Sequence, residues 1–200
     1  MICFTTEQGA TIEPEFSGQR TICPGCGGEL VACCGQIVMW HWRHLSGVDC
    51  DPWAESPSAW HIRWQHYLKT LGASLEVFMS KDGENHRADA VLPGGTVIEL
   101  QCSGISVDEI ETRERFYRNM IWVFDARDPY KKDRFNLRPR GDYYSFRWKH
   151  PRKSVAYTTA PARLDLGGGK VLNVRRMSKN TPCGGWGHLK HVRALESGYA

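Results

Sequence analysis

The stretch HRADAVLPGGTVIELQC, residues 86–102, places polar side chains inside two apolar runs. His86–Leu92 and Thr96–Cys102 both have the composition of strands, and the Pro-Gly-Gly between them indicates a turn. Asp89 lies in the first run, and Glu99 and Gln101 lie in the second. Because side chains alternate across a strand, Glu99 and Gln101 share one face. Pairing of the two strands as a hairpin would bring Asp89 close to Glu99.

Two converging carboxylates are costly unless a cation joins them, because each raises the proton affinity of the other. Mg²⁺ prefers one or two carboxylates together with waters and a phosphate. We therefore expect Asp89 and Glu99 to bind Mg²⁺ or Mn²⁺, and a bound water to become the nucleophile. Gln101 would orient that water or the scissile phosphate by hydrogen bonding. A paired acidic site within strands has no cheap structural explanation.

The sequence on both sides predicts the order helix, three strands, helix, strand, which is a mixed α/β core. Apolar residues at helical spacing indicate the first helix, and a capping box indicates the second. The last strand, MIWVF, is almost continuously apolar, as expected for a strand covered on both faces. Besides the two strands above, the expected elements are a helix from Ser56-Pro57 to Gly72, a strand over 74–79, a helix from Ser106 to about Arg118 and a strand over 120–124.

Residues 1–52 are rich in Cys, Gly and His and offer little apolar material for a core. Five of the eight cysteines fall between Cys23 and Cys50, and we expect no secretion signal, so metal binding fits better than disulfides. We expect a zinc-ribbon-like module whose structural Zn²⁺ is bound by Cys23, Cys26, His41 and His44. Substitutes for any one ligand are Cys33, Cys34 and Cys50. The alternative without a metal is buried thiols with surface histidines.

Charge is distributed unevenly along the 200 residues. Met1–Ala126 carries 9 Lys and Arg against 17 Asp and Glu, whereas Arg127–Ala200 carries 17 against 5. A strongly basic C-terminal third fits an electrostatic contact with a phosphate backbone, with a solvated face as the alternative.

Short strands are expected in the basic third, so we predict a β-rich extension. The expected elements are strands over 142–149 and 154–159 and a hairpin over 164–174. The glycine-rich stretch 182–188 has no clear assignment. No apolar run reaches the roughly 20 residues that a bilayer span needs, and we expect a cytoplasmic protein that does not bind membranes.

Seven short motifs resemble, in their order along the chain, those of the competence protein CoiA-like family in the PD-(D/E)xK nuclease superfamily. The resemblance covers about Cys23–Asp125 and fades in the basic third. The motifs are Cys23-Pro-x-Cys26, His41-x-x-His44, Asp49-Cys-Asp-Pro-Trp53, Trp60-His61, His86-Arg-Ala-Asp89, Ile98-Glu-Leu-Gln-Cys-Ser103 and Arg113-Glu-Arg-Phe-Tyr117.

This resemblance implies a restriction-endonuclease-like core, a metal-dependent DNA nuclease activity and a role in processing incoming or recombining DNA. Asp89, Glu99 and Gln101 would take the catalytic positions, with Gln where the superfamily motif has Lys. A lysine would both position water and stabilise negative charge, whereas glutamine does only the first, so activity could be slow or lost. The remaining implied roles are a catalytic one for His61, a metal ligand at Glu76 and phosphate contacts by Arg113 and Tyr117.

Each of these four remaining assignments has a structural alternative. His61 could be a partly buried helix histidine bonded to a backbone carbonyl. Glu76 could be an exposed strand residue or an ion-pair partner. Arg113 could form a surface pair with Glu109, one helical turn earlier, and Tyr117 could belong to the core.

The sequence thus predicts three parts: a zinc-binding module over 1–52, a nuclease core over 53–126 and a basic extension over 127–200. The expected function is that of an Mg²⁺- or Mn²⁺-dependent deoxyribonuclease, with DNA and recombination proteins as partners. The alternative is a catalytically inactive nuclease fold that binds DNA or a recombination protein. A zinc-ribbon transcription regulator would leave the strand carboxylates unexplained.

Overall fold

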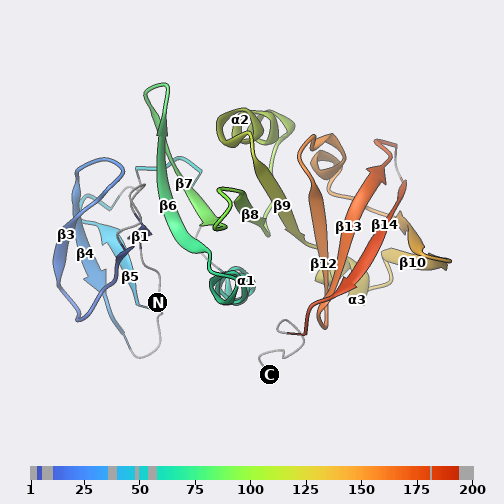
Figure 1. Cartoon of the computed structure of the whole chain (residues 1–200), viewed down its shortest axis with the longest axis horizontal. Helices are drawn as coiled ribbons and strands as arrows, with labels where there is room; N and C mark the ends of the chain where they lie inside the picture. The colour runs from blue at the N-terminus through green and yellow to red at the C-terminus, as the bar shows by residue number, and fades with distance from the viewer. Residues whose placement is uncertain are drawn as a thin grey trace. The chain divides into compact units, whose positions relative to one another are not determined.

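The computed structural model describes residues 4–5, 11–35, 40–47, 50–53, 58–180 and 182–193 (Figure 1). The chain forms two compact units, and each is described by itself. Unit 1 consists of Met1–Ser56 and Leu68–Gly95, and unit 2 consists of Pro57–Tyr67 and Thr96–Ala200. Helix α1 (Ala59–Thr70) contributes residues to both. The three domains expected over 1–52, 53–126 and 127–200 stay a prediction.

Unit 1 contains two groups of paired strands. One is an antiparallel sheet in the order β3-β4-β5, and the other has the order β2-β1-β6-β7. Leu30, Ala32 and Trp42 of the first sheet pack with Phe78 of β6 in a common apolar cluster. The strands are β1 (Phe4–Thr5), β2 (Thr11–Ile12), β3 (Arg20–Ile22), β4 (Glu29–Cys33), β5 (His41–His44), β6 (Ser74–Lys81) and β7 (Glu84–Val91).

Unit 2 contains a run of paired strands in the order β8-β9-β12-β13-β14-β11-β10. β8, β9 and β12 pair in parallel, and the remaining pairs are antiparallel. The elements are β8 (Val97–Gln101), α2 (Val107–Tyr117), β9 (Met120–Asp125), α3 (Arg127–Lys131), β10 (Phe135–Arg140), β11 (Tyr143–Trp148), the 3-10 helix η1 (Lys153–Tyr157), β12 (Ala162–Gly167), β13 (Lys170–Met177) and β14 (Cys183–His191). The protein is therefore a mixed α+β fold dominated by its strands.

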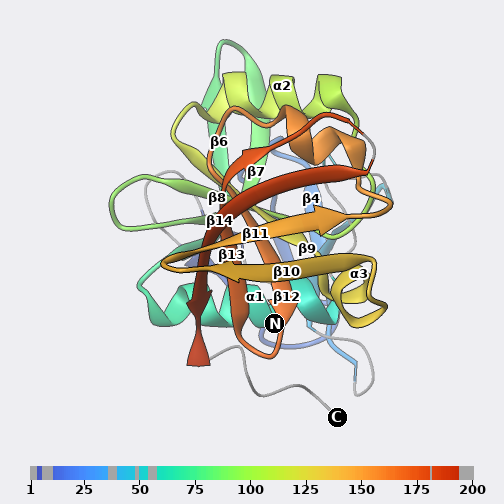
Figure 2. The same cartoon turned by 90° about the vertical axis from the view of Figure 1, so that its right-hand side faces the viewer.

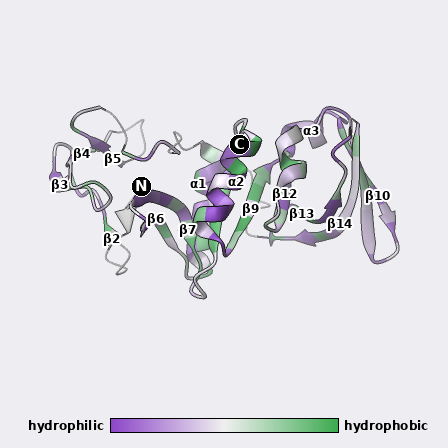
Figure 3. Cartoon of the chain, turned by 90° about the horizontal axis from the view of Figure 1, so that it is seen from above, coloured by the Kyte–Doolittle hydropathy of each residue, from purple (hydrophilic) through white to green (hydrophobic). Residues whose placement is uncertain are grey.

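The elements of the expected core are confirmed close to their expected bounds. The Ser106–Glu109 capping box is formed, and the helix that it starts runs to Tyr117. Strand β9 is buried over most of its length, as its apolar sequence predicts, and it is among the most hydrophobic elements in Figure 3. The expected start at Ser56-Pro57 lies outside the described residues. In the described part, Ser58 accepts a hydrogen bond at its Oγ from the backbone N–H of His61.

The strand expected over 154–159 is wrong, because this segment forms the 3-10 helix η1. Its backbone groups find local partners in place of a ladder. The N–H of Val155 donates to the carbonyl of Arg152, and the hydroxyl of Thr158 donates to the carbonyl of Val155. Val155 is buried, so one apolar residue is covered without a strand.

The glycine-rich stretch 182–188 forms most of β14, which lies between β13 and β11. A Cβ atom at Gly185 would lie 2.5 Å from the ring of Phe146, and one at Gly187 would lie 2.3 Å from the backbone oxygen of Asn173. Only glycine permits these approaches. The expected strand over 142–149 and the hairpin over 164–174 are confirmed by β11 and by β12 with β13.

Within the described ranges, no helix is both long and apolar enough to cross a bilayer.

Candidate active site and metal centres

Four side chains of unit 1 form a compact Cys/His cluster. The ligand atoms of Cys23, Cys26, His44 and Cys50 all lie within 4.8 Å of one another. Cys23 and Cys26 come from the turn after β3, and His44 is the last residue of β5. The turn is closed by hydrogen bonds from the N–H of Gly27 to the carbonyl of Cys23 and from the N–H of Cys23 to the carbonyl of Gly28.

The spacing in this cluster fits a tetrahedral ion. The Sγ atoms of Cys23 and Cys50 are 3.7 Å apart, and Sγ of Cys26 lies 3.4 Å from Nε2 of His44. On a tetrahedral zinc with Zn–S bonds of about 2.3 Å, two sulfurs would be about 3.8 Å apart, and a sulfur and a nitrogen about 3.6 Å apart. The cluster is therefore compatible with Zn²⁺.

Two thiols of this cluster, those of Cys23 and Cys50, resist deprotonation in the absence of a metal ion. Burial raises the pKa of Cys23 and of Cys50, and at Cys50 the nearby Cys23 adds to the effect of burial. A buried thiolate is costly without a compensating positive charge. Without a metal ion these thiols therefore stay protonated, and a bound cation would supply the positive charge that their thiolate form requires.

The structure brings together three of the four expected zinc ligands, with Cys50 in the place of His41. His41 and His44 are three residues apart on β5, and a strand directs such positions to opposite faces. His44 is buried within the cluster, whereas His41 is half-buried and lies opposite Cys33 in the ladder. The expected ligand set with His41 stays a prediction, and the cluster that the structure forms has Cys50 as its fourth member.

A pair of carboxylates lies on β6 and β7 of unit 1. Leu75 pairs with Ala90 and Val77 with Ala88, so Glu76 lies directly opposite Asp89. A carboxylate oxygen of Glu76 is within 4.8 Å of one of Asp89. Like charges at opposed strand positions repel, and this arrangement therefore suits a cation.

The backbone at Glu76 is strained. Its φ of 49° lies in the left-handed region, which typically costs a residue with a side chain about 1–3 kcal/mol. Of the two structural alternatives considered for Glu76, the ion pair is formed, because Nε of Arg87 lies 2.8 Å from its Oε2. The side chain is not exposed, because Glu76 is only 5% accessible to solvent. Strain held at a carboxylate next to a second carboxylate marks this position as a functional candidate.

Asp51 fixes the segment after the Cys/His cluster onto β7. Its Oδ2 accepts a hydrogen bond of 2.7 Å from the backbone N–H of Arg87, and its Oδ1 lies 3.1 Å from Nδ1 of His86. The rings of Trp53 and His86 stack with their centroids 3.2 Å apart. The motif at Asp51 and Trp53 therefore holds the strand that carries Asp89, a role that the sequence did not reveal.

Glu99 and Gln101 lie on β8 in unit 2, and every residue of this strand is buried. Nη1 of Arg113, on α2, donates a hydrogen bond of 2.9 Å to Oε2 of Glu99. Nε2 of Gln101 donates one of 2.8 Å to the hydroxyl of Ser103. The turn at 92–95 joins the two units, so the expected convergence of Asp89 and Glu99 stays a prediction.

Three other expected site residues are buried in unit 2. Arg113 is 5% exposed, and Glu109, the partner expected for it, lies 3.9 Å away, farther than Glu99. His61 lies on α1 and is 7% exposed. Tyr117 is also 7% exposed, and its ring packs edge-on against Phe116. Their assigned roles in catalysis and DNA contact stay predictions.

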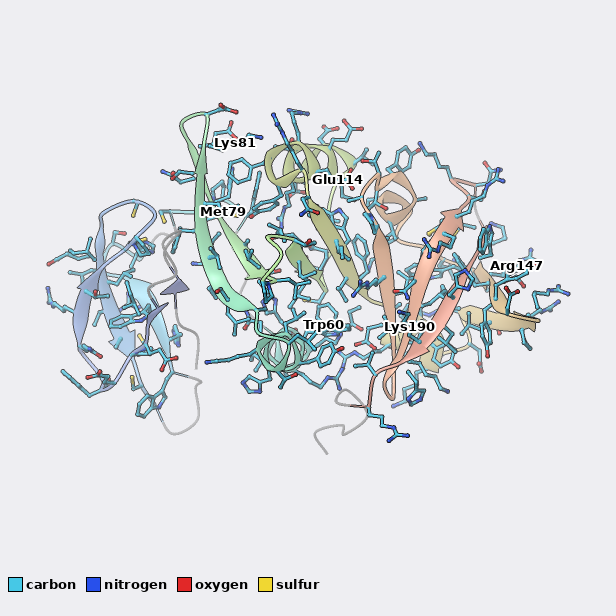
Figure 4. All side chains as sticks on the ribbon, in the orientation of Figure 1. Trp60, Met79, Lys81, Glu114, Arg147 and Lys190 are labelled. Atoms are coloured by element: carbon cyan, nitrogen blue, oxygen red, sulfur yellow. The ribbon has the colours of Figure 1, made fainter. Side chains whose placement is uncertain are left out.

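Sequence reasoning missed Asp165, a fully buried carboxylate on β12. Its Oδ2 accepts hydrogen bonds from the indole N–H groups of Trp60 and Trp64, at 2.8 and 2.9 Å, and Nη2 of Arg63 lies 3.5 Å away (Trp60 is labelled in Figure 4). Its Oδ1 accepts from the backbone N–H of Gly167. A polar residue between Leu164 and Leu166 was the available signal, and it is the same signal that identified Asp89.

Comparison with known families matches residues 62–160 to the family described as "Competence protein CoiA, nuclease-like domain". This match supports a CoiA-like family for the chain. The matched span contains Glu76, Asp89, Glu99 and Gln101 together with Arg113. It excludes the Cys/His cluster and most of the basic third. No curated protein and no solved structure matches the chain.

The match over residues 62–160 confirms the resemblance to the CoiA-like family that the motifs indicate. The nuclease-like domain supports a hydrolase acting on nucleic acids, and the Cys/His cluster is compatible with the expected zinc-binding module. His61 lies one residue before the matched span.

Proposed function

We propose that the protein is a DNA nuclease that hydrolyses phosphodiester bonds with the help of Mg²⁺ or Mn²⁺. The observation that carries the proposal is the match to a nuclease-like domain over a span that contains the opposed carboxylates of Glu76 and Asp89. A divalent cation bound between the two carboxylates would offset their repulsion and would explain why the strained backbone at Glu76 is kept.

In this proposal Asp89 and Glu99 bind the cation, and Glu76 is the further ligand. Gln101 orients water or the scissile phosphate by hydrogen bonding, because an amide can donate and accept at once. His61 moves a proton. A bound divalent cation would supply positive charge to the phosphate and lower the pKa of a water.

Arg113 has a second role in the proposal, which is to fix the orientation of Glu99. Its guanidinium already engages one oxygen of that carboxylate, and a carboxylate with a fixed orientation binds metal with less loss of side-chain entropy. Contacts of Arg113 and Tyr117 with DNA phosphate remain part of the proposal. The Cys/His cluster binds a structural Zn²⁺, since four protein ligands leave no open position for chemistry.

The deciding experiment incubates the full chain with single-stranded, duplex and branched DNA in Mg²⁺, in Mn²⁺ or in EDTA. We expect cleavage with a divalent cation and none in EDTA. Asp89→Asn and Glu99→Gln should each lower the rate by more than about 100-fold, because even outer-shell partners of a metal are worth about 10–100-fold. Titration of Mn²⁺ by calorimetry should show weaker binding in the same variants.

Glu84→Gln is the matched control, because Glu84 is an exposed carboxylate on the same strand as Asp89. It should cut and bind Mn²⁺ like the unchanged protein. Cleavage that survives both Asp89→Asn and Glu99→Gln in a clean preparation, or that continues in EDTA, contradicts the proposal.

A second candidate function is that of an inactive nuclease fold that binds DNA or a recombination protein. Two observations favour it: Gln stands at position 101, where the superfamily motif has Lys, and the Glu99 carboxylate is engaged by Arg113. It predicts salt-sensitive DNA binding that is indifferent to Mg²⁺ and to Asp89→Asn. Either function belongs in the cytoplasm, with incoming or recombining DNA as the expected partner.

A further inference from the structure

Four strands of unit 2, β10, β11, β14 and β13, present one polar face. Residues that pair directly share a face, and Arg138 pairs with Ser145, which pairs in turn with Trp186. Alternation along each strand extends this face. We call it the basic-aromatic face and define it by Arg138, Arg140, Tyr143, Arg147, Trp186 and His188. Figure 2 shows β10, β11 and β14 side by side at the front.

The opposite face of the same strands is apolar. Phe135 and Phe146 stack with ring centroids 5.0 Å apart, and Trp148 packs edge-on against Phe135. All three are buried, and Cys183 of β14 is buried with them. The core therefore fixes which side of the strands points outward, and the basic-aromatic face is that side.

The basic-aromatic face is strongly positive. The four strands carry seven Lys or Arg residues, with two on β10, one on β11, three on β13 and one on β14, and they carry no Asp or Glu. Within the described residues, Arg138, Arg140 and Arg147 take part in no ion pair (Arg147 is labelled in Figure 4). Their charge is therefore available to a polyanion.

Three rings form a connected series on this face. Tyr143 and Trp186 have centroids 5.5 Å apart at an interplanar angle of 69°, and Trp186 and His188 have centroids 5.8 Å apart at 82°. Trp186 is 37% exposed, although an indole normally avoids water. These tilted rings lie on the same face as the arginines, and the exposed indole of Trp186 offers a π surface there.

We propose that the basic-aromatic face binds single-stranded DNA. Arginines along a strand pair contact phosphates, and exposed rings stack with bases, which is how proteins hold single strands without reading their sequence. In a duplex the base faces are already stacked on one another, so Trp186 and Tyr143 would have no base to accept. The pattern of charge plus rings therefore favours a single strand over a duplex.

This inference rests on the proposed function only for the choice of DNA as the ligand. None of the six residues that define the face is a proposed catalytic residue, and binding to the face needs no metal. The face would hold a single strand during cleavage, or hold it alone if the nuclease fold is inactive. Binding and cleavage can consequently be lost separately.

The test measures fluorescence anisotropy of labelled 20-mer oligonucleotides with the full chain in EDTA, where no cutting is expected. The unchanged protein should bind single-stranded DNA more tightly than duplex DNA or RNA of the same sequence. Trp186→Ala should lower the affinity about tenfold, as expected for one stacked base, and Trp186→Phe should keep most of it. Arg138→Gln with Arg147→Gln should reduce the slope of log affinity against log salt by about 1.4, or about 0.7 per lost phosphate contact.

Matched controls come from unit 1. Trp40 is 38% exposed, nearly the same as Trp186, so Trp40→Ala should leave the affinity unchanged, and Arg20→Gln should leave the salt slope unchanged. Circular dichroism and thermal melting check that each variant is folded. Because binding is measured in EDTA, its outcome does not depend on metal-dependent cleavage, which separates this proposal from the nuclease proposal.

Three results would overturn the inference. The first is tighter binding of duplex DNA or of RNA than of single-stranded DNA. The second is an equal loss of affinity in folded Trp40→Ala and Trp186→Ala. The third is unchanged affinity and salt slope in folded variants of the face.

Discussion

Arg113 and Glu99 form an ion pair inside unit 2, with 2.9 Å between Nη1 and Oε2 and both side chains almost completely buried. Removal of one member of such a pair leaves the other charge in an apolar environment. The residue expected to meet DNA at the surface is thus tied first to a residue of the proposed catalytic site.

Arg113→Ala should therefore lower the free energy of unfolding by about 3 kcal/mol, the lower end for breaking a buried pair. Urea denaturation measures the loss. Arg115→Ala, an exposed position on the same helix, is the control and should cost much less. Equal losses in the two variants would show that the pair contributes nothing. For the same reason Glu99→Ala should be less stable than Glu99→Gln, which keeps an acceptor for Arg113.

The composition of the Cys/His cluster predicts which substitutions release zinc. Cys50→Ala should purify with less than one zinc per chain, because it removes a sulfur 3.7 Å from that of Cys23. His41→Ala should keep its zinc, because His41 is outside the cluster. Plasma mass spectrometry of the purified variants gives the metal content. Loss of zinc from His41→Ala with retention by Cys50→Ala would restore the ligand set expected from the sequence.

Asp165 accepts two indole N–H groups and faces a guanidinium, so it stabilises unit 2. Asp165→Ala leaves two buried indole N–H groups without their acceptor and a guanidinium without its counter-charge, and should cost about 3–5 kcal/mol. Thermal melting with the exposed Asp142→Asn as control measures the difference. A melting temperature of Asp165→Ala within a degree of the control would contradict the assignment.

Burial raises the pKa of Cys183 to about 11. In the unfolded chain the thiol ionises near pH 8.5, so the unfolded state loses its proton first as the pH rises. The contribution of Cys183 to stability is therefore complete below about pH 8.5 and is lost progressively up to about pH 11. Between pH 8 and 10.5 the unchanged protein should lose about 2 kcal/mol more than Cys183→Ala. Parallel slopes in urea denaturation would refute this.

Local signals were sufficient for the elements that depend on neighbours in the sequence. Ser106 and Glu109 are three residues apart, and their reciprocal hydrogen bonds form within one helical turn. The apolar run of β9 likewise reports its own burial. Such features need no knowledge of the rest of the chain.

Other features depend on contacts that the sequence does not display. The segment at Val155 has a strand-like composition, yet it forms a 3-10 helix whose backbone hydrogen bond joins residues three apart. The glycines of β14 became interpretable only with Phe146 and Asn173 beside them. Cys50 and His44 were both visible as candidates, but the presence of Cys50 in the cluster depends on its fold, and the absence of His41 depends on the alternation of side chains along β5.

The acceptor shared by Trp60 and Trp64 lies about a hundred positions further along the chain, and both Trp60 and Asp165 fall outside residues 62–160. A shortened protein cut at those borders would retain Trp64 and Arg63 but discard the carboxylate that accepts the indole N–H of Trp64 and forms an ion pair with Arg63. Such a fragment should aggregate on expression. Swaps of nuclease segments between relatives would have to carry the beginning of α1 and the whole of β12 together.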